Sequence, residues 1–567
     1  MVLRMVKFTC GGILVLAAAL PCLAVLKSHM CSVDFDKGTG IGLLKETFTK
    51  KMYCAYLGIP YVQPPVGELR FEDPVPFIFA GTGHFNKPGA QCLQDDDKCN
   101  ELACSEDCLY LNVYTPKIKR SHKSLLTMPV LVWIHGGSFV EGSSETDIFG
   151  SDFFLDENLI VVTINYRLGP YGFLGIEDLN IPANLGLKDQ TEALRWVQRN
   201  IGSFGGDPAR VTLMGWSAGA ASATYHLYSP ASKGLFQRAI AMSGTMSQPW
   251  AYNFLNQWCS NEFLHRVDAT TKEELKARAA KFIAPNIVFR YFTFDYLCWM
   301  PSGDTIYAPR HPFEIVQTMA PISDVPLLVG ETALELENLY NEREFVMGRF
   351  NYPNDNVTIY ERVKGYIEQT GSNRSAKVFY RKLASMADIK FGVHYFVEQA
   401  SNHFKAPIYR YRFSFDGPFG YAKNVLYRTG YPVLSGAMHG DDLGYLFTPY
   451  NYAGIVAPSS NVENKTRELL AKKALRIQRR MVRLWTNFIK HGNPTHNTVN
   501  WRNNQTIVWH PYNDPSGAKR RILHIDQQIR EQTDRTEENF YYQLWNTVFN
   551  CLYYFQCQFL ENLTEYY

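Results

Sequence analysis

The sequence predicts an α/β protein built on a large, mostly parallel sheet. Apolar runs of strand length alternate along the chain with segments that carry apolar residues at helical spacing. The runs are almost continuously apolar, which is typical of strands that helices cover on both faces. The chain has 567 residues and 46% of them are hydrophobic, so it can bury a large core. We expect one large domain over residues 31–555, followed by a short tail over residues 556–567.

Seven strands and two flanking helices are predicted from these patterns. The predicted strands are residues 129–135, 159–165, 210–215, 238–242, 326–329, 408–413 and 521–525. A helix over residues 187–201 precedes the third of these strands, and a helix of small residues over 218–228 follows it. The alternation of strand and helix is the pattern of a doubly wound sheet.

A further amphipathic helix is predicted over residues 465–491, and Gly492-Asn493-Pro494 ends it. Its apolar residues are Leu470, Ala474, Ile477, Met481, Trp485 and Phe488. Its polar residues include a basic stripe, which consists of Lys472, Lys473, Arg476, Arg479, Arg480 and Arg483. A stripe of this kind either attracts an acidic partner or, more commonly, is the solvated face of the helix.

The first 24 residues have the composition of a secretory signal peptide. Arg4 and Lys7 precede an apolar run over residues 8–26, and the small residues Cys22 and Ala24 suit cleavage after Ala24. The alternative is an uncleaved anchor, because the run approaches the roughly 20 residues that cross a bilayer. Cleavage is favoured because the small-residue site lies inside the run. We expect a secreted protein with no membrane span after cleavage.

Cysteines and glycosylation sequons agree with export. Of the 12 cysteines, Cys10 and Cys22 lie in the leader, which leaves an even set that suggests disulfides in a secreted chain. No metal site is expected, because Cys99, Cys104 and Cys108 have no nearby set of histidines. The sequons begin at Asn356, Asn373, Asn464, Asn504 and Asn562. The net charge of +3 makes neither nucleic acid nor an anionic membrane an expected main partner.

A serine lies between two glycines directly after the predicted strand 210–215. The stretch reads Gly215-Trp-Ser217-Ala-Gly219, and the helix of small residues begins at once. A strand that turns this sharply into a helix needs backbone angles and close approaches that a Cβ opposes, so glycine is expected on either side. The pattern predicts a nucleophile elbow that presents the hydroxyl of Ser217.

A nucleophilic serine needs a base, and an acid that orients the base. His439 lies downstream in the loop Ser435-Gly-Ala-Met-His439-Gly-Asp-Asp-Leu443, whose small residues leave its ring able to reach a site. We expect His439 to be the base rather than a locally bonded loop histidine. Three carboxylates follow the predicted strand 326–329 and remain open as the acid: Glu331, Glu335 and Glu337.

A reaction at an acyl carbon also needs donors for the oxyanion. The stretch Gly136-Gly137-Ser138 directly follows the predicted strand 129–135, and its backbone N–H groups can approach a substrate closely. Together with the N–H of Ala218 they would form an oxyanion hole. Such chemistry requires no metal and no organic cofactor.

Four long stretches in their order along the chain resemble the type-B carboxylesterase and cholinesterase family, and most closely its insect secreted carboxylesterases. They are residues 58–71 (GIPYVQPPVGELRF), 105–114 (SEDCLYLNVY), 165–173 (NYRLGPYGF) and 204–208 (FGGDP). The resemblance covers nearly the whole chain. It implies the α/β-hydrolase fold, with a large mostly parallel central sheet, helices on both faces and a small N-terminal antiparallel sheet.

The resemblance also implies roles for single residues. It implies a catalytic triad of Ser217, Glu335 and His439, with Glu337 as the alternative acid. The implied oxyanion donors are Gly137, Ser138 and Ala218. The implied disulfides join Cys92 to Cys108 and Cys259 to Cys298. Two further candidate pairs are Cys31 with Cys54, which would link neighbouring N-terminal strands, and Cys99 with Cys104. Arg70 with Glu106 and Arg167 with Asp189 are similar to structural ion pairs of the family.

The sequence departs from the family at three positions near these residues. Ser138 stands in place of the third glycine of the family's triplet, and Leu336 follows Glu335 where a glycine is usual. Trp216 precedes the nucleophile, where acetylcholinesterases have glutamate and juvenile hormone esterases have glutamine. A cationic substrate would therefore meet no carboxylate there, and acetylcholine is not expected. Five aromatic residues could line an apolar gorge for the substrate, although aromatic residues more often belong to the core. They are Phe289, Tyr291, Phe292, Phe294 and Trp299.

The resemblance and the motifs together predict a secreted serine esterase that acts on small lipophilic esters. The alternative is a ligand-binding or adhesion ectodomain that has lost catalytic power. Such ectodomains usually lack the nucleophile or the base, whereas all three triad residue types are present here. The enzyme is therefore the favoured hypothesis.

Overall fold

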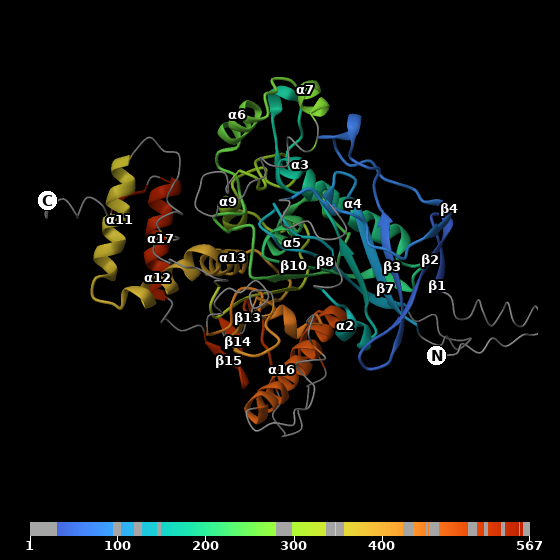
Figure 1. Cartoon of the computed structure of the whole chain (residues 1–567). Coiled ribbons are helices and arrows are strands. Elements are labelled where there is room, and N and C mark those ends of the chain that lie inside the picture. The colour runs from blue at the N-terminus through green and yellow to red at the C-terminus, as the bar shows by residue number, and fades with distance from the viewer. Residues whose placement is uncertain are drawn as a thin grey trace, which may run out of the picture.

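One large sheet organises the computed structural model of the chain (Figure 1). The structure describes residues 31–94, 104–117, 127–144, 149–278, 280, 298–335, 346, 357–422, 424, 435–448, 452, 464–496, 507–514, 520–533, 539–554 and 556–558. Within these residues the sheet has 13 strands. The predicted signal peptide, residues 1–24, lies outside the described residues, as does most of the predicted tail.

The strand order follows from the hydrogen-bonded neighbours. It is β1 (Cys31–Phe35), β2 (Lys37–Glu46), β3 (Met52–Pro60), β7 (Tyr110–Pro116), β9 (Ile160–Ile164), β8 (Met128–Ile134), β10 (Gly206–Trp216), β11 (Arg238–Met242), β12 (Leu327–Thr332), β13 (Ile408–Phe413), β14 (Arg521–Ile525) and β15 (Ile529–Thr533). From β9 to β14 every neighbouring pair is parallel. The predicted mostly parallel sheet is thus confirmed.

The N-terminal strands are mostly antiparallel and continue into the same sheet. β2 pairs with β1 through residues 38–42 and with β3 through residues 43–46, antiparallel in both cases. β4 (Ala80–His84) adds a parallel neighbour on β2. The expected N-terminal antiparallel part is therefore present, but the long β2 joins it to the central sheet. A separate two-stranded ladder joins β5 (Gln91–Cys92) to β6 (Cys104–Ser105).

Helices cover the sheet on both faces, as Figure 1 shows. The described helices are α2 (Asp152–Asp156), α3 (Gly169–Phe173), α4 (Leu185–Asn200), α5 (Ala218–Tyr228), α6 (Asn256–Arg266), α7 (Lys272–Ala277), α9 (Pro312–Thr318), α11 (Val357–Gly371), α12 (Ala376–Ser385), α13 (Phe391–Ala400), α16 (Asn464–His491) and α17 (Asn539–Tyr554). Apolar residues of α4, α5 and α13 form one buried cluster with the sheet, and those of α2 and α16 form another. None of the described helices is long and apolar enough to cross a bilayer.

The alternation of side chains along β8 explains why both faces are covered. Val130 and Val132 belong to the cluster on the α4 and α5 side, whereas Leu131 and Trp133 belong to the cluster on the α16 side. All four side chains are fully buried. A strand that is apolar at every position is stable only where helices exclude water from both of its faces.

The predicted elements have the expected types, and their bounds differ by only a few residues. The strands 238–242, 408–413 and 521–525 coincide with β11, β13 and β14. The predicted strand 326–329 instead continues as β12 through Gly330, Glu331 and Thr332. Glu331 and Thr332 are polar but fully buried, and β13 pairs with all three residues.

Three of the four disulfides considered from the sequence lie within the described residues. The structure forms Cys31–Cys54, Cys92–Cys108 and Cys259–Cys298. Cys104 is also disulfide-bonded, and its expected partner Cys99 lies outside the described residues. A further disulfide, Cys551–Cys557, ends α17 and was not predicted from the sequence. Short loops of this kind lock local conformation more than they constrain the unfolded chain.

Two of the five sequons fall on described residues. Asn373 lies in an exposed turn between α11 and α12, and Asn464 begins α16. Asn356, Asn504 and Asn562 lie outside the described residues. An exposed turn is accessible to a glycan, so Asn373 is the sequon that the fold best accommodates.

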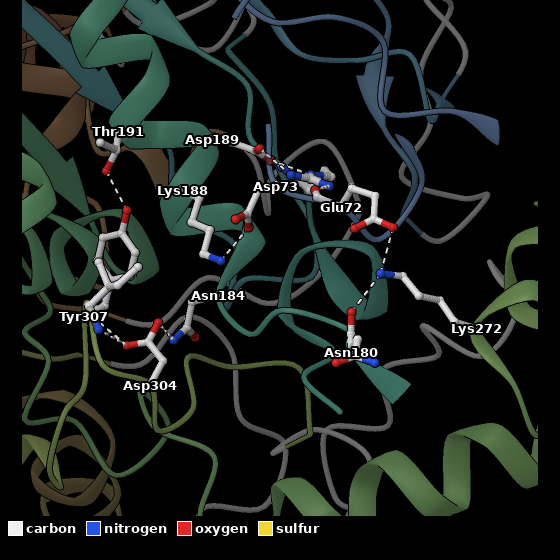
Figure 2. Close-up of polar contacts among 12 residues, drawn as sticks. Glu72, Asp73, Asn180, Asn184, Lys188, Asp189, Thr191, Lys272, Asp304 and Tyr307 are labelled. Atoms are coloured by element: carbon white, nitrogen blue, oxygen red, sulfur yellow. Dashed lines mark hydrogen bonds and ion pairs between the residues drawn. The ribbon is translucent and has the colours of Figure 1, made fainter. Parts of the chain in front are cut away.

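Two ion pairs with little solvent exposure join segments that are far apart in the chain. Arg70 contacts Glu106 through two nitrogens, and Arg167 Nη2 lies 2.7 Å from Asp189 Oδ1. Figure 2 shows Asp189 within a wider set of polar contacts at the start of α4, in which Lys188 meets Asp73. Asp189 is fully buried, so its carboxylate depends on the guanidinium of Arg167.

Replacing Arg167 with methionine should destabilise the fold strongly. The substitution leaves Asp189 buried without its cation, and removing one partner of a buried pair typically costs about 3–5 kcal/mol. Urea unfolding followed by fluorescence measures the free energy of unfolding. The control is Lys50→Met, which breaks an ion pair with Glu46 whose side chains are 75% and 50% exposed and should change stability little. Equal losses in the two variants would contradict the structural role of Arg167.

Candidate active site

Ser217 lies on a sharp turn between β10 and α5. Its backbone angles are φ 57° and ψ −121°, a conformation that non-glycine residues rarely adopt. A Cβ on Gly215 would lie 2.1 Å from the carbonyl oxygen of Gly219, and one on Gly219 would lie 2.2 Å from that of Ile134. Both flanking glycines are therefore required sterically. The turn has the geometry of the nucleophile elbow predicted from the sequence.

Hydrogen bonds hold this turn in place. The backbone N–H of Ser217 donates to the carbonyl of Met242 at 2.8 Å, and its own carbonyl accepts from the N–H of Ala221 at 2.9 Å. A Cβ on Gly244 would lie only 2.3 Å from the Ser217 carbonyl oxygen. The segment after β11 thus packs directly beneath the elbow and supports its strained conformation.

Four neighbouring strands bring residues of the site to one edge of the sheet. β8, β10, β11 and β12 lie side by side and parallel, so their carboxyl ends meet at the same edge. Gly136 follows β8, Ser217 follows β10, Ser243 follows β11 and Glu335 follows β12. Reactive groups of open parallel sheets lie at this edge because the connecting loops converge there.

His439 and Glu335 form a buried acid–histidine pair. His439 Nδ1 lies 2.6 Å from Glu335 Oε2, and the two residues are 8% and 1% exposed. A ring whose Nδ1–H donates to a carboxylate carries its basic lone pair on Nε2. The pairing therefore selects the tautomer that a general base requires.

Three further donors and acceptors fix the orientation of Glu335. Its Oε1 accepts from the hydroxyl of Ser243 at 2.6 Å and from the N–H of Thr332 at 2.5 Å. Its backbone N–H donates to the hydroxyl of Ser385 at 3.0 Å. Both carboxylate oxygens are thus hydrogen-bonded, which offsets the cost of burying this group.

The structure separates the three candidate acids. Glu335 contacts His439, whereas Glu331 Oε1 lies 2.9 Å from Arg412 and 3.3 Å from Arg410 on β13. Glu337, the alternative acid, lies outside the described residues. Of the two described carboxylates, only Glu335 reaches the imidazole.

Trp216 joins the loop that carries His439 to the loop that follows β8. Its ring centroid lies 4.8 Å from that of His439. A Cβ on Gly440 would lie 2.8 Å from Trp216 Cζ2, and a Cβ on Gly136 would lie 2.7 Å from Cε3. Both loops therefore need glycine where they pack against the indole. Because Trp216 directly precedes Ser217, this packing brings the three predicted segments to one place.

The loop after β8 packs against the nucleophile. A Cβ on Gly136 would lie 3.0 Å from the Cβ of Ser217. Gly137, Ser138 and Phe139 all have positive φ, at 112°, 52° and 64°. The Gly137 carbonyl accepts from the N–H groups of Val140 and Glu141, so the loop is closed into a tight turn. Successive backbone N–H groups in a tight turn can form a concavity that binds an anion.

His135 belongs to this loop and is not a second base. Its Nδ1 lies 2.7 Å from the carbonyl oxygen of Gly136, and its ring stacks on Tyr166 at 4.5 Å. Burial lowers the pKa of His135 to about 4, although the contact with Gly136 raises it. A neutral histidine bound to its own loop holds backbone geometry and does not exchange protons near neutral pH.

Two functional neighbours were not predicted from the sequence. Ser243 holds Glu335, and its signal was the serine–glycine pair directly after the predicted strand 238–242. Asp442 lies in the same turn as His439 and is fully buried. It lies three residues after His439 in the sequence, but no sequence pattern indicated a role for it.

Asp442 is a buried carboxyl close to the acid–histidine pair. Burial is the main cause that raises its pKa to about 7, whereas the hydroxyl of Tyr411, which donates to Oδ2 at 2.7 Å, lowers the pKa. The carboxylate of Glu335 raises the pKa and the imidazole of His439 lowers it. With a pKa of about 7, the carboxyl of Asp442 carries a proton for about half of the time near neutral pH.

Of the five aromatic residues expected to line a gorge or to lie in the core, the structure describes Trp299. Trp299 is 5% exposed and packs edge-on against Phe263 at 5.1 Å, beside the Cys259–Cys298 disulfide, so it is a core residue. The others, Phe289, Tyr291, Phe292 and Phe294, lie outside the described residues. Tyr421, which was not predicted, packs against Trp216 at 5.4 Å.

The strand order and the chemistry at the strand ends are those of an α/β hydrolase. Solved structures agree: a juvenile hormone esterase from Manduca sexta, with OTFP covalently attached, superposes with a TM-score of 0.74. It is 26% identical and covers 92% of this chain and 100% of its own. A structure titled PNB esterase has a TM-score of 0.68 at 25% identity and covers 90% of this chain and 98% of its own.

The chain belongs to the carboxylesterase family, whose model matches residues 30–545. Esterase FE4 of Myzus persicae is 32% identical over 94% of this chain and 97% of its own length. Venom carboxylesterase-6 of Apis mellifera is 30% identical over 85% of this chain and 88% of its own length. The resemblance stated from the motifs is thereby confirmed, and the chain is a carboxylester hydrolase. The alternative of a non-enzymatic ectodomain is correspondingly disfavoured.

Replacing Asp442 with asparagine should flatten the pH dependence of stability. A carboxyl whose pKa is raised from 3.8 to about 7 on folding binds its proton more tightly in the folded state. The wild-type protein therefore loses stability as the pH rises from about 4 to about 7, and Asp442→Asn removes that loss. Urea unfolding at about pH 5 and pH 8 measures the difference. The exposed Asp34→Asn is the control, and a variant as pH-sensitive as wild type would contradict the assignment.

Proposed function

We propose that this carboxylester hydrolase is a secreted serine esterase that acts through an acyl-enzyme on Ser217. The observation that carries the proposal is the 2.6 Å contact between His439 Nδ1 and Glu335 Oε2 beside the strained elbow of Ser217. The pair would hold the imidazole in the tautomer that accepts a proton at Nε2. No metal or organic cofactor takes part in the proposed reaction.

Each residue has a defined step in the proposed mechanism. The Ser217 oxygen attacks the ester carbonyl while its proton passes to His439 Nε2. The backbone N–H groups of Gly137, Ser138 and Ala218 stabilise the oxyanion of the tetrahedral intermediate. The intermediate collapses to an ester of Ser217, and the same proton leaves with the alcohol. Water then attacks the acyl-enzyme with His439 again as base, which releases the acid and restores the hydroxyl.

The residue before the nucleophile supports a neutral, lipophilic substrate. Trp216 offers an indole where a carboxylate would attract a cationic ester, and it packs on Tyr421 and on the ring of His439. Named relatives include a juvenile hormone esterase of Tribolium castaneum and an acylcarnitine hydrolase of Mus musculus. We therefore propose small lipophilic carboxylic esters as the substrate class.

Three features of the chain support the proposal that the enzyme is secreted. The N-terminal 24 residues have signal-peptide composition, and the structure contains disulfides, which persist in oxidising compartments. The sequon at Asn373 lies in an exposed turn. We propose that the mature enzyme begins after Ala24 and carries N-linked glycan.

Ser217→Ala should abolish hydrolysis of p-nitrophenyl and naphthyl esters, by a factor on the order of 10⁴ or more, because the acyl-enzyme cannot form. It should also abolish labelling by a fluorophosphonate probe, which mass spectrometry of the adduct detects in the wild-type protein. Hydrolysis at equal rates in wild type and Ser217→Ala would refute the mechanism.

The matched control is Ser232→Ala, which removes a different serine–histidine contact. Ser232 Oγ lies 2.7 Å from His226 Nδ1, and both residues are fully buried. His226 Nε2 meets the amide of Gln190 rather than a carboxylate, and burial lowers the pKa of His226 to about 3. This variant should retain both hydrolysis and labelling, because proximity alone does not activate a serine.

Gly136→Ala should slow hydrolysis by roughly 100-fold or more, the effect typical of losing an oxyanion donor. The added Cβ would lie 2.7 Å from Trp216 Cε3 and 2.8 Å from the Trp216 carbonyl oxygen, so the loop must move away from the nucleophile. The control is Gly202→Ala, whose Cβ meets no atom within 4 Å. Steady-state kinetics on a p-nitrophenyl ester, with melting temperatures, distinguish a lost donor from a lost fold. Unchanged kcat in Gly136→Ala would argue against this loop as the oxyanion hole.

A further inference from the structure

The exposed face of α16 carries a continuous basic stripe. At about 3.6 residues per turn, positions 472, 476, 479 and 483 share one side of the helix. The opposite side packs into the core through Ala474, Ile477, Met481, Trp485 and Phe488. Figure 1 shows α16 as the long orange helix along the lower edge of the molecule. The stripe therefore faces outward because the apolar side of the same helix is already used.

Three arginines of the stripe are exposed and lack a carboxylate partner among the described residues. Arg476, Arg479 and Arg483 are exposed, and no described acidic side chain lies within 4.0 Å of them. Lys472 pairs with Glu468 on the preceding turn at 2.7 Å, and Lys473 Nζ lies 3.5 Å from the neutral amide of Gln527. Within the part of the chain that the structure describes, the stripe thus presents guanidinium groups without a carboxylate partner over about two turns of helix.

The basic side chains are spaced so that they repel one another. Arg479 and Arg480 follow Arg476 by three and four residues. Arg483 in turn follows Arg479 by four residues and Arg480 by three. Like charges at these spacings destabilise a helix by a few tenths of a kcal/mol per pair. Burial lowers the pKa of Arg480, and the charge of Arg476 lowers it further. The arrangement costs stability in the free protein, and a bound polyanion would relieve that cost.

We propose that the stripe is a docking site for a sulfated polysaccharide chain. Planar guanidinium groups bind sulfate oxygens through two parallel hydrogen bonds, and regularly spaced arginines match a polymer of regularly spaced anions. The site goes beyond ester hydrolysis, and it would hold the secreted enzyme at an extracellular surface or matrix. The choice of a polysaccharide depends on the export proposed above, because an exported protein meets such polymers.

Two other polyanions fit the surface less well. Single-stranded nucleic acid binds to surfaces that combine positive charge with exposed aromatic rings, but both aromatic residues of α16, Trp485 and Phe488, are buried. An anionic membrane holds helices that bury an apolar face in the lipid, but that face of α16 packs on the sheet. Only Leu469 and Leu470, near the start of the helix, are exposed apolar residues.

The test compares heparin binding by the full-length secreted enzyme and by Arg476→Gln/Arg479→Gln/Arg483→Gln. The wild-type protein should bind immobilised heparin, and the logarithm of its affinity should fall linearly with the logarithm of the salt concentration. The triple variant should bind at least about 10-fold more weakly, and its salt slope should fall by roughly two to three, because each ion pair contributes somewhat less than one.

A control variant and two further measurements separate this site from a general effect of charge. The control Lys87→Gln/Lys233→Gln/Lys377→Gln removes three exposed cations elsewhere and should keep heparin affinity within about twofold. Without heparin, the triple arginine variant should melt at the same temperature as wild type or higher, because repulsion is relieved. Both variants should hydrolyse p-nitrophenyl esters at the wild-type rate, since neither alters a residue of the active site.

Three results would overturn the proposal. The first is a wild-type enzyme that heparin does not retain at about 0.15 M salt. The second is an equal loss of affinity in the arginine variant and the lysine control. The third is tighter binding to duplex DNA, or to vesicles of phosphatidylserine, than to heparin under the same conditions. A protein that lacks esterase activity could still bind heparin through this stripe. The heparin experiment therefore tests the docking site separately from the catalytic mechanism.

Discussion

The strained turn at Ser217 is the constraint on which the rest of the structure depends. A non-glycine residue at φ 57° is stable only where its surroundings fix it. Gly215 and Gly219 remove the Cβ atoms that would collide, and the segment after β11 supplies both a hydrogen bond and close packing. The sheet order that places β8, β10 and β11 side by side is therefore also what makes the elbow possible.

Trp216 gives the site a character of its own. The indole lies between the Gly136 loop and the His439 loop, so one side chain sets the spacing of these two loops. Gly136 and Gly440 are glycines because a Cβ at either position would lie within 2.8 Å of the indole. In the proposed mechanism, the same residue would therefore fix the site's geometry and present an apolar surface to the substrate.

The three buried carboxyl groups at this end of the sheet are held in different ways. Glu335 has hydrogen bonds on both carboxylate oxygens, burial raises the pKa of Asp442, and Glu331 pairs with Arg410 and Arg412. The basic stripe on α16 is a separate feature of an outer surface, where charge is shaped by solvent rather than by burial.

The sequence by itself determined the α/β class, the strands and helices that frame Ser217, the position of the elbow, and His439 as the candidate base. These follow from local patterns, since periodicity and a glycine-flanked serine need no knowledge of distant residues. Only the tertiary structure decided that Glu335 rather than Glu331 meets the imidazole, that Ser243 holds it, and that Asp442 lies buried nearby. Those facts depend on contacts between segments about a hundred residues apart, which the order of strands in the sheet creates and no local pattern records.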